Sequence, residues 1–72
     1  MLVRVELNRE KLKQLREQNS LTQEELAELS EISDRHLRNL ETVSTMPSAP
    51  VLCRICRALN ITMDELMTVH ND

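Results

Sequence analysis

The segment from residue 34 to residue 42 carries polar side chains that share one face of a predicted helix. Leu37 and Leu40 are three residues apart, and at about 100° per residue they define the opposite, buried face. The polar residues are Asp34, Arg35, Arg38, Asn39 and Thr42. Their types suit hydrogen bonding to nucleic-acid bases and phosphates, and the same pattern also fits an ordinary solvated face.

Different positions on this face predict different contacts. An arginine fork pairs with two acceptors of guanine, which suits Arg35, and an asparagine amide pairs with adenine, which suits Asn39. Asp34 could accept a hydrogen bond from cytosine N4 or repel phosphate from a wrong register. Arg38 and Thr42 are expected to contact the phosphate backbone. Each good base contact would contribute roughly 1–3 kcal/mol of discrimination.

Cysteine and histidine are the other residue types that could do chemistry. Cys53 and Cys56 form a C-x-x-C, which can be redox-active or half of a zinc site. A structural zinc site needs four ligands, and His36 and His70 have no spacing that fits a known finger. We therefore expect both cysteines to be inert thiols in the core, and we expect no metal and no cofactor. His70 is expected in a frayed C-terminal tail. With no catalytic constellation in the sequence, we expect no enzymatic activity.

The elements that must position the polar face begin at Thr22. Thr22 and Glu25 form a capping box that opens a helix with Leu26 and Leu29 as its apolar stripe. A four-residue turn follows at 30–33, and its last residue, Ser33, is placed to cap the next helix. Two helices joined by so short a turn cross steeply. The pattern predicts a helix-turn-helix unit, whose second helix can lie in a DNA major groove.

The other segments predict one strand and three more helices. Residues 2–7 alternate as a strand does, with Val3, Val5 and Leu7 on one side. The helices are expected from Asn8 to about Gln18, from Ser48 with Pro50 in the first turn, and from the capping box Thr62-x-x-Glu65. We therefore expect an all-α fold of five helices with a short N-terminal extended segment. It would be one domain, residues 1–72, with the helix-turn-helix at about 22–42.

Composition limits the alternatives. The 72 residues include no glycine and no aromatic residue, so the core must be aliphatic and glycine-rich phosphate loops are excluded. We find no apolar run long enough to cross a membrane and no secretory signal pattern. A cytoplasmic protein with reduced cysteines is the expectation.

Short motifs are spread along most of the chain. They are Leu12, Leu15 and Arg16, the run LTQEELA at 21–27, Ile32-Ser33, Leu37, Leu40-Glu41, Pro47, Leu52, Ala58-Leu59 and the run ITMDEL at 61–66. With these motifs the chain resembles the lambda-repressor-like helix-turn-helix domains of the Cro/XRE family. The resemblance implies a five-helix fold and sequence-specific binding of double-stranded DNA, commonly as a homodimer acting as a transcriptional regulator.

The resemblance also implies roles for individual residues. It puts base readers at Ser33, Asp34, Arg35 and Asn39. Gln23, at a helix start that favours anions, would hold the DNA backbone and brace the next helix. Arg16 and Glu41 would form a buried ion pair that ties the first helix to the end of the third. Ser44 and Thr45 lie in the loop after that helix and are candidates for phosphate contacts.

Two positions depart from the family pattern. The family usually has glycine in the turn between the two helices, where this chain has Glu31, and again after the third helix, where it has Thr42-Val43. Residues other than glycine seldom adopt a positive φ, and β-branched ones almost never do. We therefore expect the backbone at both positions to differ from that of the family.

The charge distribution qualifies the DNA hypothesis. The net charge is −3, whereas basic domains are the usual electrostatic signature of nucleic-acid binding. Basic residues outnumber acidic ones five to three in residues 1–19 and four to one in 35–57, while residues 20–34 hold five acids and no base. Few phosphate contacts predict a shallow salt dependence, which a dimer reading two half-sites would offset.

The sequence thus favours a sequence-specific, double-stranded DNA-binding transcriptional regulator of repressor-like type, with its third helix in the major groove. The alternative is an antitoxin or accessory protein-interaction module on the same fold. The strand at 2–7 and the tail with Met63, Met67 and Val69 offer apolar surface for a protein partner or for self-association.

Overall fold

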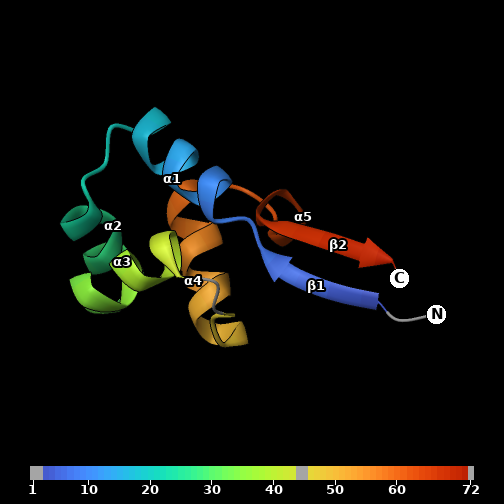
Figure 1. Ribbon diagram of the computed structural model, residues 1–72. Coiled ribbons are helices and arrows are strands. Elements are labelled where there is room, and N and C mark those ends of the chain that lie inside the picture. Colours follow the sequence, from blue (N-terminus) through green and yellow to red (C-terminus); the bar gives the residue numbers. More distant parts are fainter. Residues whose placement is uncertain (1–2, 44–45, 72) are drawn as a thin grey trace.

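The computed structural model describes residues 3–43 and 46–71. Within these residues the chain forms five helices and two strands (Figure 1). In order they are β1 (Val3–Leu7), α1 (Arg9–Gln18), α2 (Gln23–Leu29), α3 (Asp34–Thr42), α4 (Ala49–Leu59), α5 (Met63–Leu66) and β2 (Met67–Asn71). The molecule is elongated, 39 × 21 × 20 Å, with α2 and α3 at one end and the sheet projecting from the other (Figure 1).

Side-chain caps set the starts of the helices where the sequence predicts them. The side chains of Asn8, Thr22, Ser33 and Ser48 each accept a hydrogen bond from a backbone N–H in the first turn of α1, α2, α3 and α4. At α2 the box is complete, because the Glu25 carboxylate accepts the Thr22 backbone N–H at 2.9 Å. The hydrogen bond from the Thr22 backbone, and to a smaller extent the one with the Thr22 side chain, lower the pKa of Glu25. The predicted caps of these four helices are confirmed.

The turns are closed without glycine. Ser20, Glu31 and Asn60 adopt left-handed backbone angles, with φ of 58°, 57° and 57°. The expectation that Glu31 would avoid the glycine-like conformation is therefore wrong. At the end of α3, Val43 does not adopt the left-handed conformation, because its backbone is extended with φ of −114°. A β-branched residue pays more for a positive φ than glutamate does, which accounts for the difference.

One aliphatic core joins the helices. Its fully buried side chains are Leu12, Leu26, Leu37, Leu40, Ile55 and Leu66. Leu29 does not belong to it: that side chain is 57% exposed, so the predicted apolar stripe of α2 is wrong at this position. The prediction of two core thiols is half wrong, because Cys56 is buried and Cys53 is exposed. Both errors have one geometric cause: at about 100° per residue, Leu29 and Cys53 lie roughly 100° or more around their helices from the centre of the buried face.

The sheet corrects the expectation of an all-α fold. β1 and β2 are antiparallel, with Val3 opposite Asn71, Val5 opposite Val69 and Leu7 opposite Met67. The predicted N-terminal strand is confirmed within the described residues. The predicted frayed tail around His70 is wrong, because that segment is β2 and α5 is a single turn ending at Leu66. No helix in the described ranges is long and apolar enough to cross a membrane.

Candidate nucleic-acid interface

The outer face of α3 carries the predicted contact residues. Leu37 and Leu40 are completely buried against the core, which fixes the rotation of the helix. The exposed residues of this face and its cap are Ser33, Asp34, Arg35, Arg38, Asn39 and Thr42. The buried leucines therefore bring the predicted readers together on one solvent-facing surface.

Two hydroxyl groups on this surface already have partners within the helix. The Ser33 oxygen accepts the His36 backbone N–H at 3.0 Å, and the Thr42 hydroxyl donates to the Arg38 carbonyl at 2.8 Å. A phosphate oxygen can only accept a hydrogen bond. Thr42 must therefore break its hydrogen bond to the Arg38 carbonyl before its hydroxyl can donate to phosphate. Arg35 and Arg38 are exposed, so their guanidinium groups can reach a ligand directly.

A polar cluster, which we call the brace, consists of the buried Arg16 and Glu41 side chains and the half-buried Gln23. The Arg16 guanidinium donates from Nε to Glu41 Oε2 at 2.7 Å and from Nη2 to Glu41 Oε1 at 3.2 Å. Gln23 Nε2 donates to Glu41 Oε1 at 3.1 Å, and Arg16 Nη1 donates to the Leu21 carbonyl at 2.8 Å. The brace links α1, the start of α2 and the end of α3.

The brace also determines which charges α3 presents to solvent. The Glu41 side chain is only 2% exposed and faces a guanidinium, so its negative charge is compensated inside the protein. Asp34 is then the acidic residue on the outer face, beside Arg35 and Arg38. The exposed face of α3 is consequently net positive, although the whole chain is acidic.

Two further arginines hold the helix-turn-helix unit, and sequence reasoning missed both. Arg9 Nη1 donates to the Thr42 carbonyl at the end of α3 at 2.8 Å. Arg54 Nε, on α4, donates to the Ser30 carbonyl at the end of α2 at 2.8 Å. Their acceptors are backbone carbonyls more than twenty residues away, so no local pattern reveals them. The basic residues counted in residues 1–19 and 35–57 thus include Arg9 and Arg54, which have structural roles.

Gln23 and Arg38 border a common hollow between α2 and α3. The hollow has a volume of about 290 Å³ and is lined by Thr22, Gln23, Glu24, Asp34 and Arg38. Gln23 is half-buried and keeps its amide nitrogen on Glu41, which supports the predicted bracing role. The two other predicted phosphate contacts, Ser44 and Thr45, lie outside the described residues.

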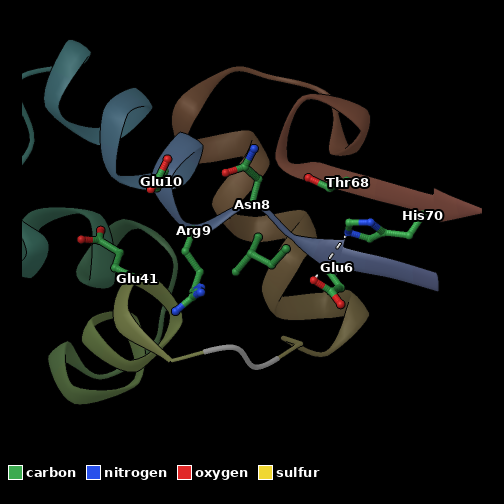
Figure 2. Close-up of a pocket in the computed structure, with 8 residues that line it drawn as sticks. Glu6, Asn8, Arg9, Glu10, Glu41, Thr68 and His70 are labelled. Atoms are coloured by element: carbon green, nitrogen blue, oxygen red, sulfur yellow. Dashed lines mark ion pairs between the residues drawn. The ribbon is translucent and has the colours of Figure 1, made fainter.

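A second hollow, of about 450 Å³, lies between the sheet and the start of α1 (Figure 2). Glu6 and His70 face each other across the strands there, with 3.7 Å between Glu6 Oε2 and His70 Nε2. Arg9 extends from the start of α1 toward the end of α3, where it meets Thr42 (Figure 2). The hollow is lined by charges of both signs, and Glu6, Arg9, Glu41 and His70 already have protein partners. The lining therefore does not favour ions of one sign.

The thiols and acids supply no metal centre in the part of the chain that the structure describes. No group of three or more histidine, cysteine, aspartate or glutamate side chains is placed to hold a metal ion there. Burial, followed by the charges of Cys53 and Glu65, raises the pKa of the Cys56 thiol. Because the thiolate is the metal ligand and nucleophile, a raised pKa favours the inert form of Cys56.

With this geometry established, comparisons with known proteins identify the family. A protein-family model described as Helix-turn-helix matches residues 12–66. The chain belongs to the Cro/C1-type helix-turn-helix family. A search among curated proteins gave no match.

Two solved structures illustrate the similarity. The restriction-modification controller protein C.AhdI from Aeromonas hydrophila is 28% identical, with a TM-score of 0.74 over 79% of this chain and 86% of that one. The clp gene regulator ClgR from C. glutamicum is 30% identical, with a TM-score of 0.70 over 79% of this chain and 74% of that one. The expected resemblance to this family is therefore confirmed.

Proposed function

We propose that this chain is a sequence-specific double-stranded DNA-binding transcriptional regulator that acts as a single domain and a homodimer. The observation that carries the proposal is the exposed, net positive face of α3, from which the brace withdraws Glu41. Family membership and similarity to two regulators support it. In a repressor-like mode, α3 would lie in the major groove of an operator and block access to a promoter.

The residues of the face divide into base readers and phosphate contacts. Arg35 has an exposed fork suited to the O6 and N7 atoms of guanine, and Asn39 an amide suited to adenine. Ser33 and Asp34, at the start of α3, are the further base-reading candidates, with Asp34 accepting from cytosine. The phosphate contacts are Gln23, Arg38, Thr42, Ser44 and Thr45.

The test is selection from random DNA duplexes at moderate salt, followed by sequencing and titration of the enriched site. The expected result is a two-fold symmetric motif with half-sites about one helical turn apart. Arg35→Ala should weaken binding by roughly 1–3 kcal/mol and relax the preference at one base pair. Arg38→Ala should weaken binding to all sequences alike and reduce the salt slope by about 1.

Arg57→Ala is the matched control, because Arg57 is also an exposed arginine, but it is on α4 and lies outside the proposed face. This variant should bind as the wild type does. If no motif is enriched and binding is equally insensitive to Arg35→Ala and Arg57→Ala, the proposal is wrong. The exposed acidic residues of α2, Glu24 and Glu28, would then direct attention to an antitoxin or accessory role with a protein partner.

A further inference from the structure

No strand among the described residues pairs with the outer edge of β1. The sheet has two strands within the described residues, with β2 on one side of β1. Asn8 donates its backbone N–H to the Leu66 carbonyl at 2.7 Å, in register with the strand pairing. Because hydrogen-bonded pairs alternate along an antiparallel ladder, Arg4 and Glu6 direct their backbone groups toward β2. The backbone groups of Val3, Val5 and Leu7 then point away from β2.

The side chains of the sheet separate into an apolar and a charged face. Leu7 is buried where the sheet meets the core, but Val3, Val5 and Val69 on the same face are 58%, 48% and 57% exposed. On the other face, Arg4 Nη1 lies 3.4 Å from Glu6 Oε1 within β1. An exposed strand edge with apolar residues is a template for pairing with another strand.

The charge pattern of β1 is complementary to itself in the antiparallel direction. When β1 is paired with a second β1 about a two-fold axis at Val5, Arg4 of each copy lies opposite Glu6 of the other. We propose that a second copy of this chain binds at this edge, so that β1 pairs with β1 and the two sheets merge into one of four strands. The occupant is chosen by charge complementarity, since opposite charges directly across two strands attract and like charges repel.

The backbone register fits the same axis. Val5 would face Val5 of the second copy, and Val3 would face Leu7, as hydrogen-bonded pairs, using the groups that point away from β2. Arg4 and Glu6 would then form the non-hydrogen-bonded pairs, in which side chains approach more closely. Charge, backbone direction and apolar contact therefore specify one register.

The outer edge of β2 does not offer this match. Two β2 strands centred on Val69 would place Thr68 opposite His70, a pair without opposite charges. The β1 edge also leaves the DNA face open, because α3 lies at the end of the molecule remote from the sheet (Figure 1). The inference deepens the homodimer in the proposed function and rests on that part of it.

Charge reversal at the two positions tests the pairing. Arg4→Glu gives a strand with two acids, and Glu6→Arg gives one with two bases, so each variant alone would place like charges opposite each other. Each variant should dimerise about tenfold more weakly than the wild type. Mixed in equal amounts they should form a heterodimer of nearly wild-type strength, because every acid then faces a base. Sedimentation equilibrium and native mass spectrometry measure both results, and circular dichroism verifies that each variant is folded.

The mixture separates contacts between copies from contacts within a strand. If both single variants weaken the dimer and the mixture fails to recover it, the charges act within one copy and the inference is wrong. If the wild type is a dimer and both variants dimerise as strongly as the wild type does, the interface lies elsewhere. The proposed homodimer and DNA binding then stand. A wild type that remains monomeric overturns both the interface and the homodimer. DNA binding is measured separately, with Arg35→Ala as its control.

Discussion

Two clusters in this molecule combine an arginine, a glutamate and a third polar side chain, which is Gln23 in the brace and His70 in the sheet. The two clusters differ in burial. In the brace, the Arg16 and Glu41 side chains are 10% and 2% exposed and meet at 2.7 Å. In the sheet, Arg4 and Glu6 are 56% and 47% exposed and meet at 3.4 Å. The same chemical types thus form a bidentate pair buried between α1 and α3 and a solvent-exposed pair on the sheet.

The difference shows that position, rather than residue type, determines what an ion pair does. Solvent screens the sheet pair, and such exposed pairs typically contribute 0–1 kcal/mol. The brace is screened much less, and both of its ions have several hydrogen-bond partners. Loss of one partner there leaves a buried charge uncompensated. We therefore assign the brace to the fold, whereas the sheet pair is the one that we propose for the recognition of a second copy.

The largest expected effect is that of Glu41→Gln. This change keeps the shape of the side chain but leaves the Arg16 guanidinium buried beside a neutral group, and it should lower the free energy of unfolding by about 3 kcal/mol. Glu6→Gln is the matched control and should change it by no more than about 0.5 kcal/mol in the monomer. Urea unfolding followed by circular dichroism measures both, and equal effects would remove the contrast between the clusters.

Gln23→Ala should have an intermediate effect. It removes the hydrogen bond from Nε2 to Glu41 Oε1, while the bonds from Arg16 to the carboxylate remain. A hydrogen bond to a charged group contributes about 1.5 kcal/mol, which is the expected loss. Gln14→Ala, at an exposed position of α1, is the control and should be nearly neutral. A Gln23 variant as stable as the Gln14 variant would show that the brace is only the Arg16–Glu41 pair.

The two thiols extend the contrast to a neutral group and should show the smallest effect. Burial raises the pKa of Cys56 above its ordinary value near 9.0. The unfolded state therefore ionises first as pH rises, so stability is complete below that value and falls between it and the raised pKa of the folded state. Urea unfolding from pH 7 to 10 should show a steeper loss for the wild type and Cys53→Ala than for Cys56→Ala. Parallel losses in all three proteins would contradict this assignment.

Local signals were sufficient for the helices and for the α3 face. Caps at Asn8, Thr22, Ser33 and Ser48 act within one turn, so the sequence alone predicts them. The leucine spacing in α3 predicts which residues face solvent. The bridge between Arg16 and Glu41 was predicted only through family resemblance, since it joins residues 25 positions apart.

Tertiary contacts account for what the sequence did not predict. β2 has few residues typical of strands, and it forms because β1 lies beside it. Leu29 and Cys53 are apolar residues on the flanks of their helices, and the neighbouring elements cover only the central part of each apolar face. Arg9 and Arg54 donate hydrogen bonds to backbone carbonyls that are distant in the sequence. Every residue type has such a carbonyl, so the type of the acceptor residue gives no signal. Periodicity cannot predict such contacts, because they depend on how the elements meet.

The three left-handed residues have a consequence for the unfolded chain. Substitution by glycine at Ser20, Glu31 or Asn60 would relieve steric crowding of roughly 1–2 kcal/mol per residue in the folded protein. It would also enlarge the set of backbone states available after unfolding, which opposes that gain. A chain without glycine thus accepts local crowding in its turns, and in return its backbone loses less conformational entropy when it folds.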